Sequence, residues 1–246
     1  MSARLWVCAL LLLSHGCTWY RARGAALDAW TLWREVRLAH VGESTLATLT
    51  FFAEEEFAPG VGELLYPDMP AHWHTRAGFD FRARTAWQQG TRGNERVLWE
   101  VTPEGFTARR DGETYHAPWG LGGGFHLEAL MWLLHPWEAA APDDVEALRL
   151  PRHGEMERLQ LRYRQGTRDT FVLEVHPRTR LVHAVEYTVN ALRLPVRCRM
   201  ELSDHRTVPS GVVVPHVWDE FLLLPSGKVH FHRMHLWDVE ATLKGP

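Results

Sequence analysis

Hydrophobic and polar residues alternate with a period of two over much of the chain, a pattern typical of strands with one buried face. The alternation is clearest in residues 79–87, 97–101, 106–108, 159–163, 171–175 and 229–239. Turn sequences separate several of these segments: TPEG at 102–105, HPRTR at 176–180 and LPSG at 224–227. Such connections are too short for parallel crossovers, so the pattern predicts an antiparallel meander in a mainly β domain.

The segment FDFRARTAW, residues 79–87, shows the facing that the pattern predicts within one strand. Phe79, Phe81, Ala83, Thr85 and Trp87 would share one face, with the intervening charged residues on the other. A long antiparallel sheet curls because its strands twist. If it does not close, apolar elements must cover its concave face. The sequence therefore predicts a single large curved antiparallel sheet, a half-open β-barrel, that helices cover on its concave side.

Two segments depart from the strand period and supply these helices. In residues 25–38 the apolar side chains Leu27, Trp30, Trp33 and Leu38 recur at helical spacing. In residues 119–137 a glycine-rich entry precedes a run that is apolar on nearly every side, which predicts a helix over 125–134 buried on most faces. No Lys-Ser/Thr follows the glycines, so this segment is not a phosphate loop.

The first residues have the features of an export signal. Arg4 gives a positive start, and Leu5–Leu13 form an apolar run that is too short to span a bilayer as a helix. Gly16-Cys17 follows, as in a bacterial lipoprotein signal whose cysteine becomes the lipidated N-terminus. We expect a signal peptide over 1–16, a tether over 17–24 and one domain over 25–246. Simple secretion and a retained anchor are the alternatives.

Cysteine and histidine spacing gives no zinc motif. Of the three cysteines, Cys198 alternates with arginines in a predicted strand and is interpreted as a small buried hydrophobe. In KVHFHRMHLWDV, His230 and His232 are expected on one strand face and His235 on the other. A second pair, His72 and His74, lies far away in the sequence. With no third ligand assigned, no metal site is predicted.

No catalytic signature stands out, and no cofactor is predicted. The chain lacks G-x-S-x-G, and the adjacent Ser203-Asp204-His205 do not by adjacency make a triad. The carboxylate run Glu54–Glu56, with Glu100 or Glu220, could serve a glycosidase, but it is interpreted as a solvated turn before Pro59-Gly60. The net charge of −3 gives no indication of a nucleic-acid partner.

The order of these elements resembles the LolA/LolB-like periplasmic lipoprotein-carrier superfamily and its LppX-like relatives. The points of resemblance are the possible lipid signal, the opening helix LDAWTLWREVRL, the interrupting helix and the final hairpin VPSGVVVPHVWDEFLLLPSGKVHFHRMHLWDVEATL. The resemblance covers about residues 25–243 and rests on element order, with no specific motif. It implies a half-open barrel whose hydrophobic cavity binds acyl chains. The arginine that governs the bound and free forms of these carriers cannot be assigned here.

The sequence thus predicts an exported envelope protein, periplasmic or membrane-anchored through lipid on Cys17, that binds a hydrophobic or acyl-chain ligand. A lipid or lipoprotein carrier is one form of this function. The predicted lining of the cavity comprises Phe81, Trp99, Phe125, Leu130, Met131 and Leu134. Two alternatives stay open: a structural envelope protein with a packed concave face, and a His-rich metal-binding protein. The sequence does not identify a protein partner.

Overall fold

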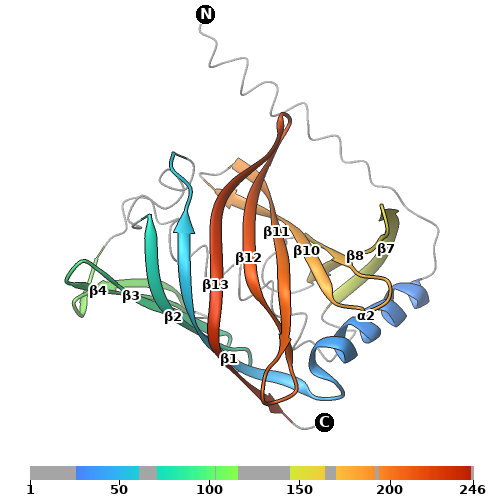
Figure 1. The fold of residues 1–246 in the computed structure, drawn as a ribbon, viewed down its shortest axis with the longest axis horizontal. Coiled ribbons are helices and arrows are strands. Elements are labelled where there is room, and N and C mark those ends of the chain that lie inside the picture. The colour runs from blue at the N-terminus through green and yellow to red at the C-terminus, as the bar shows by residue number, and fades with distance from the viewer. Residues whose placement is uncertain are drawn as a thin grey trace, which may run out of the picture.

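The computed structural model describes residues 26–60, 71–102, 104–115, 145–163, 170–191 and 194–244. Within these ranges the chain forms one helix and a single sheet of thirteen strands (Figure 1). The elements are α2 (Ala26–Val41), β1 (Thr45–Phe57), β2 (His72–Asp80), β3 (Thr85–Arg92), β4 (Glu95–Thr102), β5 (Gly105–Arg110), β6 (Glu113–Thr114), β7 (Val145–His153), β8 (Met156–Tyr163), β9 (Thr170–Val175), β10 (Val182–Ala191), β11 (Leu194–Thr207), β12 (Val213–Leu224) and β13 (Gly227–Lys244).

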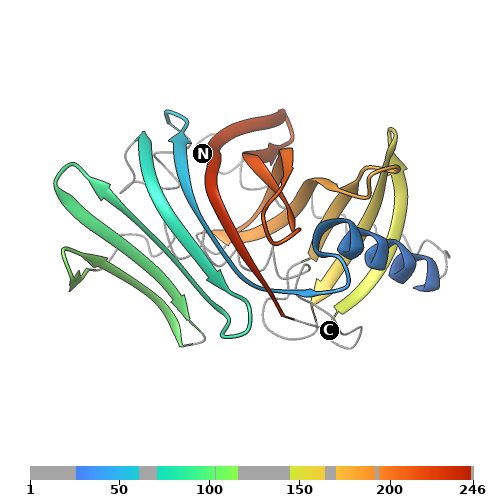
Figure 2. The same ribbon diagram turned by 60° about the horizontal axis from the view of Figure 1, so that its bottom comes forward.

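The sheet consists of two antiparallel meanders that meet at its centre. Its strand order is β6-β5-β4-β3-β2-β1-β13-β12-β11-β10-β9-β8-β7, so the first and last strands are hydrogen-bonded neighbours. The predicted turns at 102–105, 176–180 and 224–227 each connect sequential strands, which confirms the meander within each half. Among the described strands β6 and β7 do not pair, so the curved sheet stays open (Figure 2).

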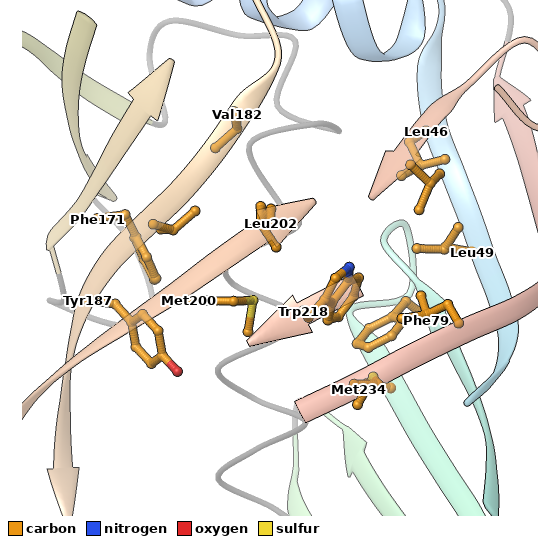
Figure 3. Close-up of a cluster of buried hydrophobic side chains, with 14 of the residues drawn as sticks. Leu46, Leu49, Phe79, Phe171, Val182, Tyr187, Met200, Leu202, Trp218 and Met234 are labelled. Atoms are coloured by element: carbon orange, nitrogen blue, oxygen red, sulfur yellow. The ribbon is translucent and has the colours of Figure 1, made fainter. Parts of the chain in front are cut away.

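One face of the sheet, here the core face, carries the buried side chains and lines the inside of the curve. In β1 the alternation places Leu49, Phe51 and Ala53 on this face, each 1% exposed or less. Side chains from both halves of the sheet gather there, among them Phe79, Trp218 and Met200 (Figure 3). The rings of Phe51 and Trp218 meet edge to face with centroids 5.7 Å apart. The opposite face is called the outer face.

Helix α2 packs mainly on β7, β8 and β12 at one end of the sheet. Its buried stripe runs through Ala29, Leu32 and Val36, whereas Leu38, which the sequence assigned to the stripe, is 42% exposed. The predicted helix is confirmed, but its contact face is rotated. An ion pair also joins the helix to the sheet, because the Asp28 carboxylate lies 2.5 Å from the guanidinium of Arg149 on β7.

The predicted single strand over 79–87 is wrong, because the chain turns at residues 81–84 between β2 and β3. The Asp80 carboxylate accepts the backbone N–H of Ala83 at 2.8 Å, which stabilises the turn. The turn changes the parity of the facing, so Phe79 and Phe81 are buried on the core face while Trp87 lies on the outer face opposite Gly78. A Cβ at Gly78 would lie 2.5 Å from the Trp87 ring, so glycine is what lets this indole lie flat on the sheet.

Several sequence predictions fall on residues outside the described ranges. These are the signal and tether over 1–24 with Cys17, and the helix over 125–134 with Phe125, Leu130, Met131 and Leu134. They therefore stay predictions. Among the described residues, no helix is both long enough and apolar enough to cross a bilayer.

Candidate functional site on the core face

A line of buried polar side chains crosses the centre of the otherwise apolar core face. Each member comes from a different strand, and each is 5% exposed or less. From one wing of the sheet to the other they are Gln88 of β3, Thr75 of β2, Glu55 of β1, His232 of β13, Glu220 of β12 and Tyr187 of β10. We call this set the polar line.

Glu55 is the acceptor at the centre of the first half. Its Oε1 accepts hydrogen bonds from the hydroxyl of Thr75 and from Nε2 of Gln88, the latter at 2.5 Å. Its Oε2 accepts from Nε2 of His232 at 3.2 Å. A fully buried carboxylate is costly unless such partners replace its hydration, and here neutral donors and one histidine do so.

His232 joins the two halves of the line. Its Nδ1 donates to Oε2 of Glu220 at 2.7 Å, and Oε1 of Glu220 accepts the Tyr187 hydroxyl at 2.6 Å. The ring of Phe57 stacks on the imidazole with centroids 4.5 Å apart. Two carboxylates, one on each side, therefore hold the imidazole in a fixed plane.

The charge state of His232 follows from these contacts. Burial acts to lower its pKa, but the hydrogen bonds and negative charges of Glu220 and Glu55 outweigh burial and raise the pKa to about 9. The side chain is therefore an imidazolium at neutral pH, and both ring nitrogens donate.

Cys198, a free buried cysteine on β11, is uncharged. Burial first, and then the negative charge of Glu220, raise the pKa of its thiol, so it stays protonated.

Two atoms of buried side chains near this line lack a hydrogen-bond partner within the described structure: Oε1 of Gln88 and Nε1 of Trp73. Trp73 lies on the core face of β2, with its indole edge to face against Trp99, centroids 5.0 Å apart. Because Oε1 of Gln88 is an amide oxygen, it can only accept a hydrogen bond, so it suits a ligand group that donates one.

Two of the predicted lining residues lie on the core face. Trp99 is 2% exposed in β4 and donates its indole N–H to the Tyr115 hydroxyl at 3.1 Å. Phe81, 1% exposed, follows β2 and lies parallel to Phe79 with centroids 6.1 Å apart. Trp99 and Phe81 thus lie on the same face of the sheet, but each contacts different side chains.

The predicted facing of the histidines in β13 is wrong at one position. A β-bulge shifts the register between β12 and β13, so that Glu220 pairs with His232 but Phe221 pairs with His230. His230 therefore lies on the outer face, where its Nε2 contacts the carboxylate of Asp219 at 3.2 Å. His232 lies on the core face, and the two do not form a pair.

The second histidine pair is on the outer face. His72 and His74 are exposed on β2, and Glu54 of β1 lies between His74 and His235 in the register. Within the described part of the chain, no three His, Cys, Asp or Glu side chains are grouped closely enough to hold a metal ion.

The interpretation of Glu54–Glu56 as a solvated turn is also wrong. All three belong to β1, and the middle one, Glu55, is 0% exposed. The signal was in the sequence, because Phe51, Ala53, Glu55 and Phe57 alternate, which places a carboxylate in an apolar series. What the sequence could not show is that His232 lies opposite it, because that requires the pairing of β1 with β13.

His40 links helix α2 to the sheet through two hydrogen bonds. His40 is 1% exposed, donates from Nδ1 to the Val213 carbonyl at 2.9 Å and accepts the Val182 N–H at Nε2 at 3.1 Å. Burial, and then the neighbouring His205 and His183, lower the pKa of His40 to about 4. It is therefore a neutral structural link. His205 itself donates from Nε2 to the Val182 carbonyl at 2.9 Å.

No known protein family matches the sequence, and no curated protein is a significant match. Solved structures that are similar include a LolA superfamily protein from Nitrosomonas europaea, 10% identical, with a TM-score of 0.46 over 86% of this chain and 92% of that chain. A domain named for outer-membrane lipoprotein sorting, from Vibrio parahaemolyticus, is 10% identical with a TM-score of 0.48 over 89% of this chain and 94% of its own.

A further similar structure is the MucA/MucB complex of Pseudomonas aeruginosa, 10% identical, with a TM-score of 0.25 over 88% of this chain and 94% of that chain. The resemblance noted from the sequence is to the same superfamily that the Nitrosomonas protein is named for. At these identities and TM-scores the likenesses carry no argument about the family, the ligand or the partner of this chain.

Proposed function

We propose that the protein is exported to the cell envelope and binds the acyl chain of an amphiphilic ligand on its core face. The observation that carries this proposal is a curved, open sheet whose inner face is mostly apolar and is crossed by the polar line. A single sheet has no second sheet to pack against, and α2 packs mainly on β7, β8 and β12. The half of the core face formed by β1–β5, with Trp73 and Trp99, extends well beyond the helix.

Burial of a hydrocarbon chain is sufficient to drive such binding. Each buried methylene contributes about 0.8 kcal/mol, so ten of them contribute about 8 kcal/mol before the costs of ordering the ligand. The polar line is the place on this face where the polar end of a ligand could form hydrogen bonds. The unpartnered Oε1 of Gln88 supports this position.

Anchoring through lipid on Cys17 is part of the same proposal. It rests on the apolar run Leu5–Leu13 followed by Gly16-Cys17. The Cys17→Ser variant should lose acyl labelling and appear in the soluble fraction. A wild-type protein without acyl labelling, together with a Cys17→Ser variant that fractionates as before, would contradict it.

The binding proposal is tested by titration with a fluorescent fatty acid. We expect the predicted helix over 125–134 to cover the cavity, so Leu130→Trp should fill it and weaken binding about tenfold or more with little change in stability. The matched control is Leu224→Trp, because Leu224 is 41% exposed at the β12–β13 turn.

A different pair of results would favour a structural envelope protein with a packed concave face. In that case the wild type would bind no fatty acid, and Leu130→Trp would overpack the core and cost about 1–3 kcal/mol of the free energy of unfolding.

A further inference from the structure

A groove on the outer face of the sheet carries a second inference, which does not depend on the core face. Its volume is about 520 Å³, and it crosses β1–β5 beside β13. The side chains that matter are Phe52, His74, Arg76, Arg96, Arg109 and Trp237. They lie opposite the buried face of the same strands, at the wing that Figure 2 shows in blue and green.

The sheet register explains how the groove is built. Phe52, Arg76, Gln89, Leu98 and Arg109 occupy paired positions on five consecutive strands and form one row across the outer face. Trp237 of β13 pairs with Phe52 and extends that row by one strand. The groove therefore has an aromatic end at the centre of the sheet and a cationic end toward its edge.

The aromatic end exposes apolar surface. Phe52 and Trp237 are each 39% exposed and stack with centroids 6.2 Å apart and an angle of 16° between the rings. The His74 ring meets the Trp237 ring edge to face, with centroids 6.3 Å apart. Stacked exposed aromatics beside a hollow of this size form a flat apolar platform of the kind that binding sites use.

The cationic end has more positive than negative charge. Within the described structure, Arg96 has no carboxylate partner. The same holds for Arg76, which belongs to the aromatic end because its guanidinium carbon lies 5.4 Å from the centroid of the Phe52 ring. Arg109 contacts Glu100 at 3.5 Å, a loose and solvent-exposed pair. At one border of the groove, Glu54 of β1 lies opposite His74 of β2 in the strand register. At the other border, the Asp111 carboxylate accepts the backbone N–H of Arg96. Among the described residues that line the groove, none carries a carboxylate.

We propose that this groove binds a small organic anion, with a phosphate or carboxylate group on Arg96 and Arg109 and an apolar or aromatic body on the Phe52–Trp237 platform. Guanidinium groups bind both kinds of oxyanion through paired hydrogen bonds. A volume of about 520 Å³ suits one small ligand. An extended peptide is disfavoured, because β1–β4 are each hydrogen-bonded on both sides and offer no free edge for strand addition.

Calorimetric titration with three probes separates the two parts of the groove. Phenyl phosphate carries both the charge and the ring, inorganic phosphate carries the charge alone, and benzyl alcohol carries the ring alone. We expect phenyl phosphate to bind at least tenfold more tightly than either of the others, and its affinity to fall as salt is added. A titration with benzoate, compared with that of phenyl phosphate, shows whether the groove prefers a carboxylate or a phosphate group.

Variants locate the binding in the groove. Arg96→Gln with Arg109→Gln should weaken phenyl phosphate at least tenfold, and Trp237→Ala should remove its advantage over inorganic phosphate. Arg82→Gln with Arg178→Gln is the control, because both residues are exposed in turns outside the groove. Absence of phenyl phosphate binding in a folded wild type, or equal loss in the control pair, would overturn the proposal. Neither result bears on fatty-acid binding at the core face.

Discussion

Replacing Glu55 by Gln tests the polar line most sharply, because the change keeps the shape of the side chain and removes one charge. In the wild type the carboxylate accepts three hydrogen bonds, one of them from the buried imidazolium of His232. The variant leaves that imidazolium with Glu220 as its described carboxylate partner. Loss of one partner of a buried ion pair costs about 3–5 kcal/mol, and retained hydrogen bonds to the amide place the expected cost at about 2–4 kcal/mol.

The pH dependence gives a second measure of the same contact. The pKa of His232 is raised from 6.5 to about 9 in the folded protein, which corresponds to roughly 3 kcal/mol of stabilisation. Because the pKa is raised, this stabilisation is fully present below pH 6.5 and is lost as the pH rises through about 9. In Glu55→Gln the pKa should be lower, so the loss between pH 6.5 and 9 should be smaller.

Urea unfolding of both proteins from pH 6 to pH 9.5 measures these quantities. The difference between variant and wild type cancels the titration of cysteines and other groups. Glu54→Gln is the matched control, because its side chain is exposed on the outer face of the same strand, and we expect it to change stability by less than about 0.5 kcal/mol. If Glu55→Gln is as stable as Glu54→Gln and shows the wild-type pH slope, the account of the polar line is wrong.

Three further predictions concern other elements. Because the pKa of His40 is lowered to about 4, the wild type should lose up to about 3 kcal/mol of stability as the pH falls from 6.5 to 4, and the slope should be flatter in His40→Gln; equal slopes in acid titrations would contradict this. His230→Ala should cost less than about 1 kcal/mol and His232→Ala about 3 kcal/mol or more by urea unfolding, since only the latter is buried between carboxylates; equal costs would show that the bulge is misplaced. Gly78→Ala should lower the thermal midpoint by forcing the Trp87 ring away, at a cost of about 1–3 kcal/mol, and an unchanged midpoint would refute this.

The sequence predicts the strands and turns well because each depends on local alternation and local turn chemistry. The alternation of Val97, Trp99 and Val101, for example, is the buried series of β4. The sequence does not predict that β1 pairs with β13, since that contact joins the two ends of the domain. Without it, Glu55 and His232 are separate residues with no reason to be considered together.

Errors in facing arise where one residue more or less changes the parity of a strand. The turn at 81–84 moves Trp87 to the outer face, and the bulge in β13 separates His230 from His232. Neither break in the period has a strong local signal in the sequence. The outer-face groove could not be predicted for another reason: Phe52, Arg109 and Trp237 become neighbours only when the strand order is known.

Native mass spectrometry of gently purified protein tests the central claim, that the core face binds an acyl amphiphile, most directly. We expect the wild type to carry a bound mass that tandem dissociation identifies as an acyl-chain compound, and Leu130→Trp to carry much less of it while remaining folded. A wild-type protein that is free of any bound amphiphile, and stays so after incubation with fatty acids and phospholipids, would contradict the claim.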